Sequence, residues 1–159
     1  MTHGLVSVGY EGRTIEDTVT ALMAMGVHTV ADVRLNAISR KPGFSKSRLR
    51  EALAAAGIEY RHLRSLGNPK DNRTPFWSGQ VEEGRRVFKG ALDNEAAVDS
   101  LRELAELASD RVVAVLCFEA DQAMCHRQVV IDEVVARGQC PWRRRRVRIP
   151  LRASRRPEC

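Results

Sequence analysis

The 159-residue sequence contains few aromatic residues and no long apolar run. Aromatic residues make up only 5% of the chain, which weakens any case for binding single-stranded nucleic acid by base stacking. No apolar stretch approaches the length of a membrane span, and the N-terminus lacks the basic flank and apolar core of a signal peptide. These absences lead us to expect a cytoplasmic protein without membrane contact.

Several common site motifs are also missing. The glycines near the N-terminus do not form a dinucleotide-binding fingerprint, and no phosphate-loop lysine motif is present. The phosphatase spacing places an arginine six positions after a cysteine, but Ala123 stands there after Cys117 and Ile131 after Cys125. The two ligand pairs of a structural zinc site are absent as well. The sequence carries none of these signatures.

The composition is that of one soluble globular domain. Hydrophobic residues make up 43% of the chain and charged residues 29%, which are ordinary values. A chain of this length can bury a core without disulfides. In a reducing cytosol we expect the four cysteines to be buried thiols, ligands or nucleophiles. We predict a single α/β domain over residues 1–150 and a disordered basic tail over residues 151–159.

The formal charge of +6 comes mostly from arginines near the C-terminus. Residues 142–149 alternate like a strand, which would place the arginines on both of its faces. One set could contact a nucleic-acid backbone, or the charges could simply block pairing between sheet edges. The arginines concerned are Arg143, Arg144, Arg145, Arg146 and Arg148.

Hydrophobic periodicity predicts alternating strands and helices. The expected strands cover residues 5–8, 27–33, 58–63, 112–116 and 142–149, and the expected helices cover residues 14–26, 45–57, 94–108 and 121–138. A long loop is expected over residues 67–90 because turn signals interrupt the pattern there. This order predicts a single three-layer α/β/α domain with a mostly parallel central sheet of about five strands.

The chemically active side chains follow the predicted strands. Residues 9–12, 32–34 and 117–127, together with the loop after Leu63, all come after a strand. In a parallel sheet the carboxyl ends of the strands meet at one crevice, where ligands bind. We therefore expect these segments to form one site.

The segment after the strand at 112–116 offers a nucleophile and bases. A helix start near Asp121 would lower the pKa of the Cys125 thiol, although a buried, inert thiol is the simpler alternative. Helical neighbours point about 100° apart, so we expect that Cys125 and His126 do not aim at one point. Glu119 and Asp32 are candidate general bases. Asp121 is better explained as a helix cap.

Two further interpretations concern metals and anions. Cys117, Cys125 and His126 are candidate ligands for a divalent metal, in a catalytic rather than a structural site. Arg34 and Arg127 could clamp a phosphate or carboxylate, or Arg34 could pair with a neighbouring carboxylate instead.

The sequence resembles the bacterial family called domain of unknown function 488. The resemblance runs in consistent order from Leu5 to Val135 and is carried by the segments Val8–Ile15, Asp32–Arg34, Pro42–Phe44, Gly57–Tyr60, Leu66–Gly67, Cys117–Glu119 and Cys125–Arg127. The usual Gly-His-Ser of the family's first turn is replaced by Gly9-Tyr10-Glu11. The resemblance implies a three-layer α/β fold with a pocket formed by these motifs, and no particular reaction. It adds Gly9, Tyr10, Glu11 and Phe44 to the expected substrate-binding residues.

Two functions are compatible with the sequence. The first is an enzyme that acts by hydrolysis or group transfer on an acidic or nucleotide-like small molecule, with Glu119, Cys125, His126 and Asp32 as catalytic residues. The alternative is a nucleic-acid-associated module that uses the arginine-rich C-terminal strand. The sequence does not specify the cofactor or the oligomeric state.

Overall fold

The structure is a computed structural model that describes residues 2–137. The strand expected at residues 142–149, its arginines and the tail expected at residues 151–159 lie outside the described residues. Within residues 2–137, no helix is long and apolar enough to cross a membrane.

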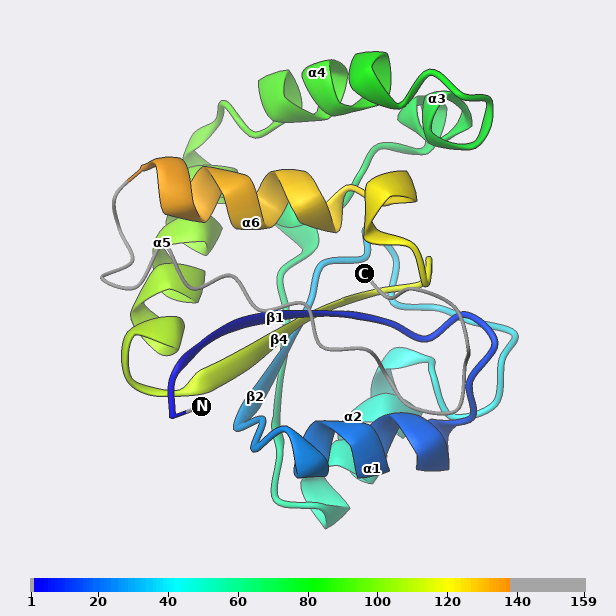
Figure 1. Cartoon of the computed structure of the whole chain (residues 1–159), viewed down its shortest axis with the longest axis vertical. Helices are drawn as coiled ribbons and strands as arrows, with labels where there is room; N and C mark the ends of the chain where they lie inside the picture. The colour runs from blue at the N-terminus through cyan, green and yellow to red at the C-terminus, as the bar shows by residue number, and fades with distance from the viewer. Residues whose placement is uncertain (1, 138–159) are drawn as a thin grey trace.

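The described residues form a four-stranded sheet in the order β1-β4-β2-β3 (Figure 1). Every neighbouring pair of strands is parallel, as expected from the alternation of strands and helices. The strands are β1 (Gly4–Gly9), β2 (Thr29–Asp32), β3 (Glu59–His62) and β4 (Val112–Cys117). The expected number was about five, and the fifth expected strand falls outside the described residues.

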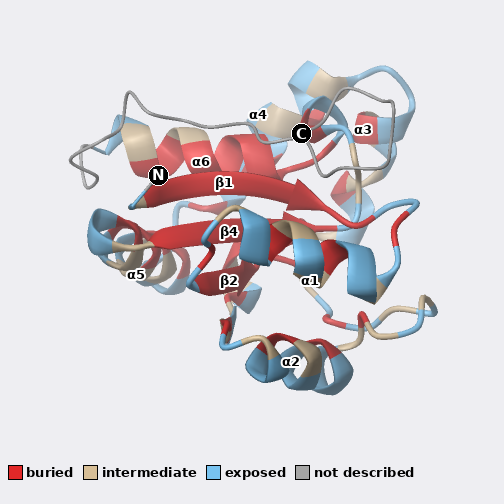
Figure 2. Cartoon of the chain, turned by 60° about the horizontal axis from the view of Figure 1, so that its bottom comes forward, coloured by how far each residue is buried: buried red, intermediate tan, exposed pale blue. Residues whose placement is uncertain are grey.

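Helices cover both faces of the sheet, so the predicted three-layer α/β/α fold is confirmed (Figures 1 and 2). One face packs against α1 and α2, and the other packs against α4, α5 and α6. The helices are α1 (Ile15–Ala24), α2 (Lys46–Ala55), α3 (Thr74–Trp77), α4 (Val81–Ala91), α5 (Glu95–Asp110) and α6 (Arg127–Ala136). Short 3-10 turns occur at η1 (Arg64–Leu66), η2 (Lys70–Asn72) and η3 (Gln122–Met124).

Strand β4 lies inside the sheet, and all of its residues are buried (Figure 2). Its side chains alternate between the two cores, because successive residues of a strand point to opposite faces. Val113 and Val115 pack in the core beneath α5 and α6, whereas Ala114 and Leu116 pack in the core beneath α1 and α2. Cys117 continues the first of these series, so its side chain emerges on the α6 side of the sheet.

The prediction of a long loop over residues 67–90 was wrong. This segment folds into η2, α3 and most of α4. Glycines and two prolines interrupt its helical periodicity, yet Gly84 permits close packing. A Cβ atom on Gly84 would lie 2.9 Å from the Phe76 ring, so α3 and α4 can touch only because residue 84 is glycine. Phe88 is fully buried and anchors α4 to the core.

The helix expected to begin near Asp121 begins later. Asp121 does act as a cap, but it accepts the Ala123 N–H at the start of the short turn η3. Helix α6 starts at Arg127, with His126 at its N-cap position. Cys125, which lies between η3 and His126, has an extended backbone with φ −136° and ψ 148°. The extended backbone at Cys125 interrupts the helical geometry and sets the directions of the Cys125 and His126 side chains.

Candidate functional site

A cavity of about 260 Å³ opens where strands β1, β2 and β4 end. Residues that follow these strands form one part of its wall, and residues from the segment around η2 and α3 form the rest. The lining residues are Tyr10, Arg34, Leu35, Asn36, Ile38, Ser39, Asn68, Arg73, Trp77, Cys117, Phe118, Glu119 and His126. The expected crevice at the carboxyl ends of the parallel strands is therefore present.

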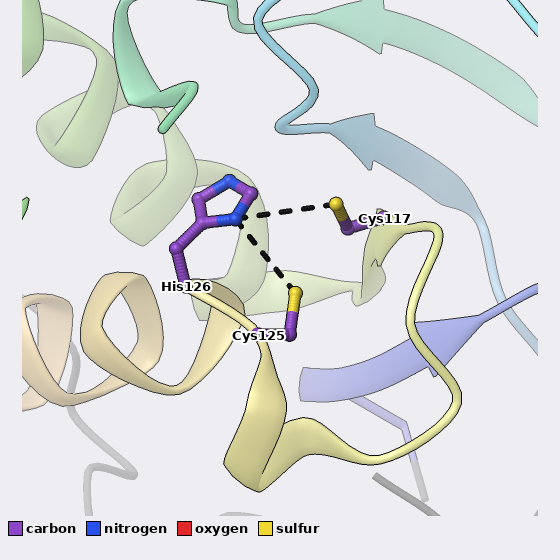
Figure 3. Close-up of side chains that lie close together, drawn as sticks. All are labelled: Cys117, Cys125 and His126. Atoms are coloured by element: carbon purple, nitrogen blue, oxygen red, sulfur yellow. Dashed lines mark hydrogen bonds between the residues drawn. The ribbon is translucent and has the colours of Figure 1, made fainter. Parts of the chain in front are cut away.

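Two thiols and one imidazole come together beside this cavity (Figure 3). His126 Nδ1 lies 3.7 Å from Cys125 Sγ and 4.0 Å from Cys117 Sγ. On the other side of the ring, Nε2 lies 2.8 Å from the Val33 carbonyl oxygen. Because a carbonyl only accepts, Nε2 carries a proton and donates it. This hydrogen bond fixes the ring so that Nδ1 faces both sulfur atoms. We call Cys117, Cys125 and His126 the thiol-imidazole cluster.

The expectation that Cys125 and His126 cannot aim at one point was wrong. It assumed helical geometry at both residues, whereas Cys125 is extended and only His126 belongs to the start of α6. Figure 3 shows both side chains turned toward the same region near Cys117. The two thiols are free and buried.

The charges of the thiol-imidazole cluster are strongly coupled. The hydrogen bond with Cys125, together with burial, raises the pKa of Cys117 well above its usual value. Burial also acts to raise the pKa of Cys125, but the hydrogen bond from Cys117 and the charges of Arg127 and His126 outweigh it and lower that pKa. Burial opposes the charging of His126, yet the adjacent Cys125 thiolate raises the pKa of His126. These shifts lower the cost of a negative charge on Cys125 and of a positive charge on His126.

Glu119 extends the thiol-imidazole cluster into the cavity wall. Its Oε2 lies 3.5 Å from Cys117 Sγ, and its backbone carbonyl oxygen accepts a hydrogen bond of 2.6 Å from Arg127 Nη2. Burial and the negative charge on Cys125 raise the pKa of the Glu119 carboxyl to about 7. A carboxylate held in this way can accept a proton near neutral pH.

A second network lies at the end of β2. Arg34 donates to both Asp32 oxygens, with Nε–Oδ1 at 2.8 Å and Nη2–Oδ2 at 2.6 Å. Its Nη1 donates to the Tyr10 hydroxyl and to the Phe44 carbonyl. Tyr60 donates to Asp32 Oδ2 at 2.6 Å. Burial disfavours the charge on Arg34, but the hydrogen bonds and charge of Asp32 outweigh it and raise the pKa of Arg34.

The predicted site residues separate into three groups. Five of them line the cavity: Tyr10, Arg34, Cys117, Glu119 and His126. Cys125 lines only a smaller adjoining cavity and is 1% exposed. The remaining predicted residues do not line the cavity, but they contact or adjoin residues that do: Gly9, Glu11, Asp32, Phe44 and Arg127.

The supporting group has defined structural contacts. Glu11 is exposed and accepts the Ala120 N–H, and Phe44 stacks on Tyr10 with ring centroids 4.2 Å apart. Arg127 does not fit the anion-clamp prediction because it is 0% exposed and donates to the carbonyl oxygens of Val8 and Glu119. Its charge holds strand ends together and is not accessible to a ligand.

The comparison with protein families can now be stated. Residues 14–134, more than half of the chain, match the family described as domain of unknown function DUF488. The chain belongs to this family. The resemblance seen in the sequence motifs is thus confirmed, and the match covers the segments that build the cavity apart from the first strand and turn. No curated protein and no solved structure matches the chain.

Sequence reasoning missed one whole side of the cavity in this DUF488 chain. Asn68, Arg73 and Trp77 line it from the segment that was predicted as a loop. A signal was present, since this segment lies directly after the Leu66–Gly67 motif and carries an aromatic pair. Phe118 was missed as a lining residue although it directly follows β4, in the segment where the site was expected.

Proposed function

We propose that this chain is an enzyme that cleaves a small acidic or nucleotide-like substrate in the cavity, by hydrolysis or by group transfer. One observation carries the proposal: Glu119, whose carboxyl is suited to proton transfer, shares the cavity wall with the cation Arg73. A site that combines proton-transfer groups with an anion-binding group suits the cleavage of an acidic molecule.

The role of Arg73 in binding rests on its surroundings. Its side chain is half-buried and makes no hydrogen bond or ion pair with any other residue in the range 2–137. Arg34 also lines the cavity, but most of its donors are used by Asp32, Tyr10 and Phe44. Arg73 is therefore the guanidinium with free donors for a substrate phosphate or carboxylate.

Size and aromatic content favour a ligand with a planar part. A volume of about 260 Å³ lies just below the roughly 300 Å³ at which typical ligand pockets begin, which favours a small metabolite. Trp77 is 59% exposed, Phe118 is 44% exposed and both line the cavity, so their rings are accessible to a ligand there. Tyr10 packs edge-on against Phe118, with ring centroids 5.4 Å apart, and supports that ring at the cavity.

Glu119 is the proposed general base. Its carboxylate belongs to the cavity wall, where it can take a proton from a water molecule or a substrate hydroxyl. The thiol-imidazole cluster lies beside it and would supply the second reacting group. We retain the expectation of a cytoplasmic location, which the free thiols Cys117 and Cys125 support, because thiols persist in reducing compartments.

The catalytic proposal is tested with the Glu119→Gln variant. Purified chain would be assayed with p-nitrophenyl acetate, p-nitrophenyl phosphate and the p-nitrophenyl ester of thymidine monophosphate. We expect wild type to hydrolyse at least one of them and Glu119→Gln to lose roughly 100-fold or more, the usual contribution of a general base. Glu106→Gln, on an exposed position of α5, is the matched control and should keep full activity.

The binding part of the proposal has its own test. Thermal unfolding would be followed with increasing inorganic phosphate or pyrophosphate. We expect both anions to raise the unfolding temperature of wild type, and Arg73→Ala to abolish the effect. Arg48→Ala removes an exposed arginine of α2 and should leave the effect intact. Equal responses of the two variants would show that Arg73 does not bind anions.

A further inference from the structure

The thiol-imidazole cluster has the chemical composition of a metal site. The ligand atoms of Cys117, Cys125 and His126 all lie within 4.8 Å of one another. Two sulfur atoms and one imidazole nitrogen suit a borderline-soft divalent ion. We propose that these three residues bind a zinc ion through Cys117 Sγ, Cys125 Sγ and His126 Nδ1. This inference does not rest on the proposed function, since metal binding is measured without any substrate.

The distances within the cluster fit a tetrahedral ion. With bonds of about 2.3 Å to sulfur and about 2.0 Å to nitrogen, tetrahedral zinc holds sulfur and nitrogen roughly 3.6 Å apart and two sulfurs roughly 3.8 Å apart. The two sulfur–nitrogen distances in the chain are 3.7 Å and 4.0 Å. Both agree with a zinc-bound arrangement to within a few tenths of an ångström.

Surrounding groups hold the three ligands in the orientation that a metal requires. The Nε2–H of His126 donates to the Val33 carbonyl at 2.8 Å, so Nδ1 is the ring nitrogen that would bind the ion, with any proton on it displaced by the metal. This arrangement of metal-binding histidines is general, because the outer hydrogen bond fixes the tautomer. Phe88 packs edge-on against the ring at 5.0 Å. The Arg127 N–H at the start of α6 points at Cys125 Sγ, 3.5 Å away, and would stabilise a thiolate.

Zinc would also explain why two thiols and an imidazole are buried together. Cys117 is 7% exposed, Cys125 1% and His126 6%. A thiolate buried away from water is costly unless an opposite charge lies against it. Two thiolates balance the double charge of a zinc ion, so the ion would leave the cluster neutral.

The fourth coordination position would open to the cavity. Cys117 and His126 line the cavity wall. Glu119 lies beside Cys117 but is not one of the three proposed zinc ligands. Catalytic zinc sites use three protein ligands and keep the fourth position for water or substrate, whereas structural sites are closed by four. The arrangement therefore fits a zinc ion that faces the cavity.

The experiment uses the full chain with Cys140→Ser and Cys159→Ser, so that only the two cluster thiols remain. The chain is dialysed against a chelator and then titrated with Zn²⁺ or Co²⁺ alone. We expect about one equivalent of zinc to bind, and the cobalt form to show tetrahedral and thiolate-to-metal absorption bands. Because Cys117, Cys125 and His126 are unchanged in this chain, the absorption bands report on the native ligands.

Substitutions at the cluster then identify the ligands. Cys117→Ala, Cys125→Ala and His126→Asn should each weaken zinc binding by more than the roughly 10- to 100-fold that loss of an outer hydrogen-bond partner costs. Cys117→Ala should also remove about half of the thiolate-to-cobalt absorption, because one of two thiolates is lost. His28→Asn, at an exposed histidine, is the control and should bind normally. Circular dichroism verifies that each variant is folded.

Any of three results would overturn the proposal: binding well below one equivalent, a cobalt spectrum without thiolate bands, or ligand variants that bind as tightly as His28→Asn. If zinc binds and no ester is cleaved, only the proposed function fails. If an ester is cleaved by chain that binds no zinc, only the metal proposal fails.

Discussion

Gly9 lies so close to Glu119 that a Cβ atom on Gly9 would be 2.0 Å from the Glu119 carbonyl oxygen and 2.8 Å from Arg127 Nη1. The ends of β1 and β4 can meet only because residue 9 has no side chain. We expect Gly9→Ala to destabilise the fold by about 3 kcal/mol, at the upper end for overpacking, since two backbone segments must separate. Urea unfolding measures this change.

Gly90→Ala provides the matched comparison for that variant. A Cβ atom there meets nothing within 4 Å, and the residue lies in α4. Alanine should be neutral or stabilise the helix by up to about 1 kcal/mol. A Gly9→Ala chain as stable as Gly90→Ala would contradict the close approach at the strand ends.

Arg127 is predicted to be a structural cation. Replacement with methionine keeps much of its volume but leaves the carbonyl oxygens of Val8 and Glu119 without their donors. Each unsatisfied buried group costs about 1–3 kcal/mol, so we expect a loss of about 3 kcal/mol or more. Arg86→Met, on an exposed arginine paired with Glu83, should leave the urea midpoint unchanged. Equal midpoints for the two variants would contradict this role.

Asp32 is predicted to hold Arg34 in place and not to exchange protons with a substrate. Asp32 is fully buried, and its oxygens accept from Arg34 and from the Tyr60 hydroxyl. Asp32→Asn would leave a buried guanidinium without its counter-charge, which typically costs about 3–5 kcal/mol. Thermal or urea unfolding measures the loss.

The control for this variant is Asp99→Asn, which breaks an exposed ion pair with Arg102 on α5. Surface pairs of this kind contribute little, so its unfolding should match that of wild type. If Asp32→Asn also unfolds like wild type while losing ester hydrolysis, Asp32 would have a chemical role in place of a structural one.

The sequence predicts those elements of the fold that depend on the local pattern of apolar and polar residues. The run Val112–Leu116 is apolar and β-branched, and it became a fully buried strand inside the sheet. Parallel pairing followed from the alternation of elements and placed the strand ends together. Cys117, Glu119 and His126 met at the cavity for this reason.

The parts that were not predicted depend on contacts between distant segments. Helix α4 packs closely on Phe76 because Gly84 has no side chain, a contact that no local pattern reveals. From the sequence, Arg127 was expected to bind an anion. In the structure its guanidinium is buried and donates to the carbonyl of Val8, more than a hundred residues earlier in the chain. The direction of the Cys125 side chain depends on the extended backbone of that residue between η3 and α6, at a boundary that local propensity does not determine.

The Glu119 carboxyl should make the stability of metal-free chain depend on pH. Burial and the Cys125 charge raise its pKa from 4.5 to about 7 in the folded state. The folded chain therefore holds this proton more tightly than the unfolded chain. The resulting stabilisation is complete below the unfolded pKa and is lost as the pH rises through the folded pKa.

Glu119→Gln imitates the protonated carboxyl at every pH. In chelator-treated protein we expect the variant to unfold like wild type near pH ~4, where both side chains are neutral. Near pH ~8.5 the variant should be more stable by at most about 3.5 kcal/mol, because each pKa unit corresponds to about 1.4 kcal/mol. Urea unfolding across this range measures the difference, and Glu106→Gln serves as the exposed control. A difference that is constant with pH would mean that the Glu119 carboxyl is not held protonated by the fold.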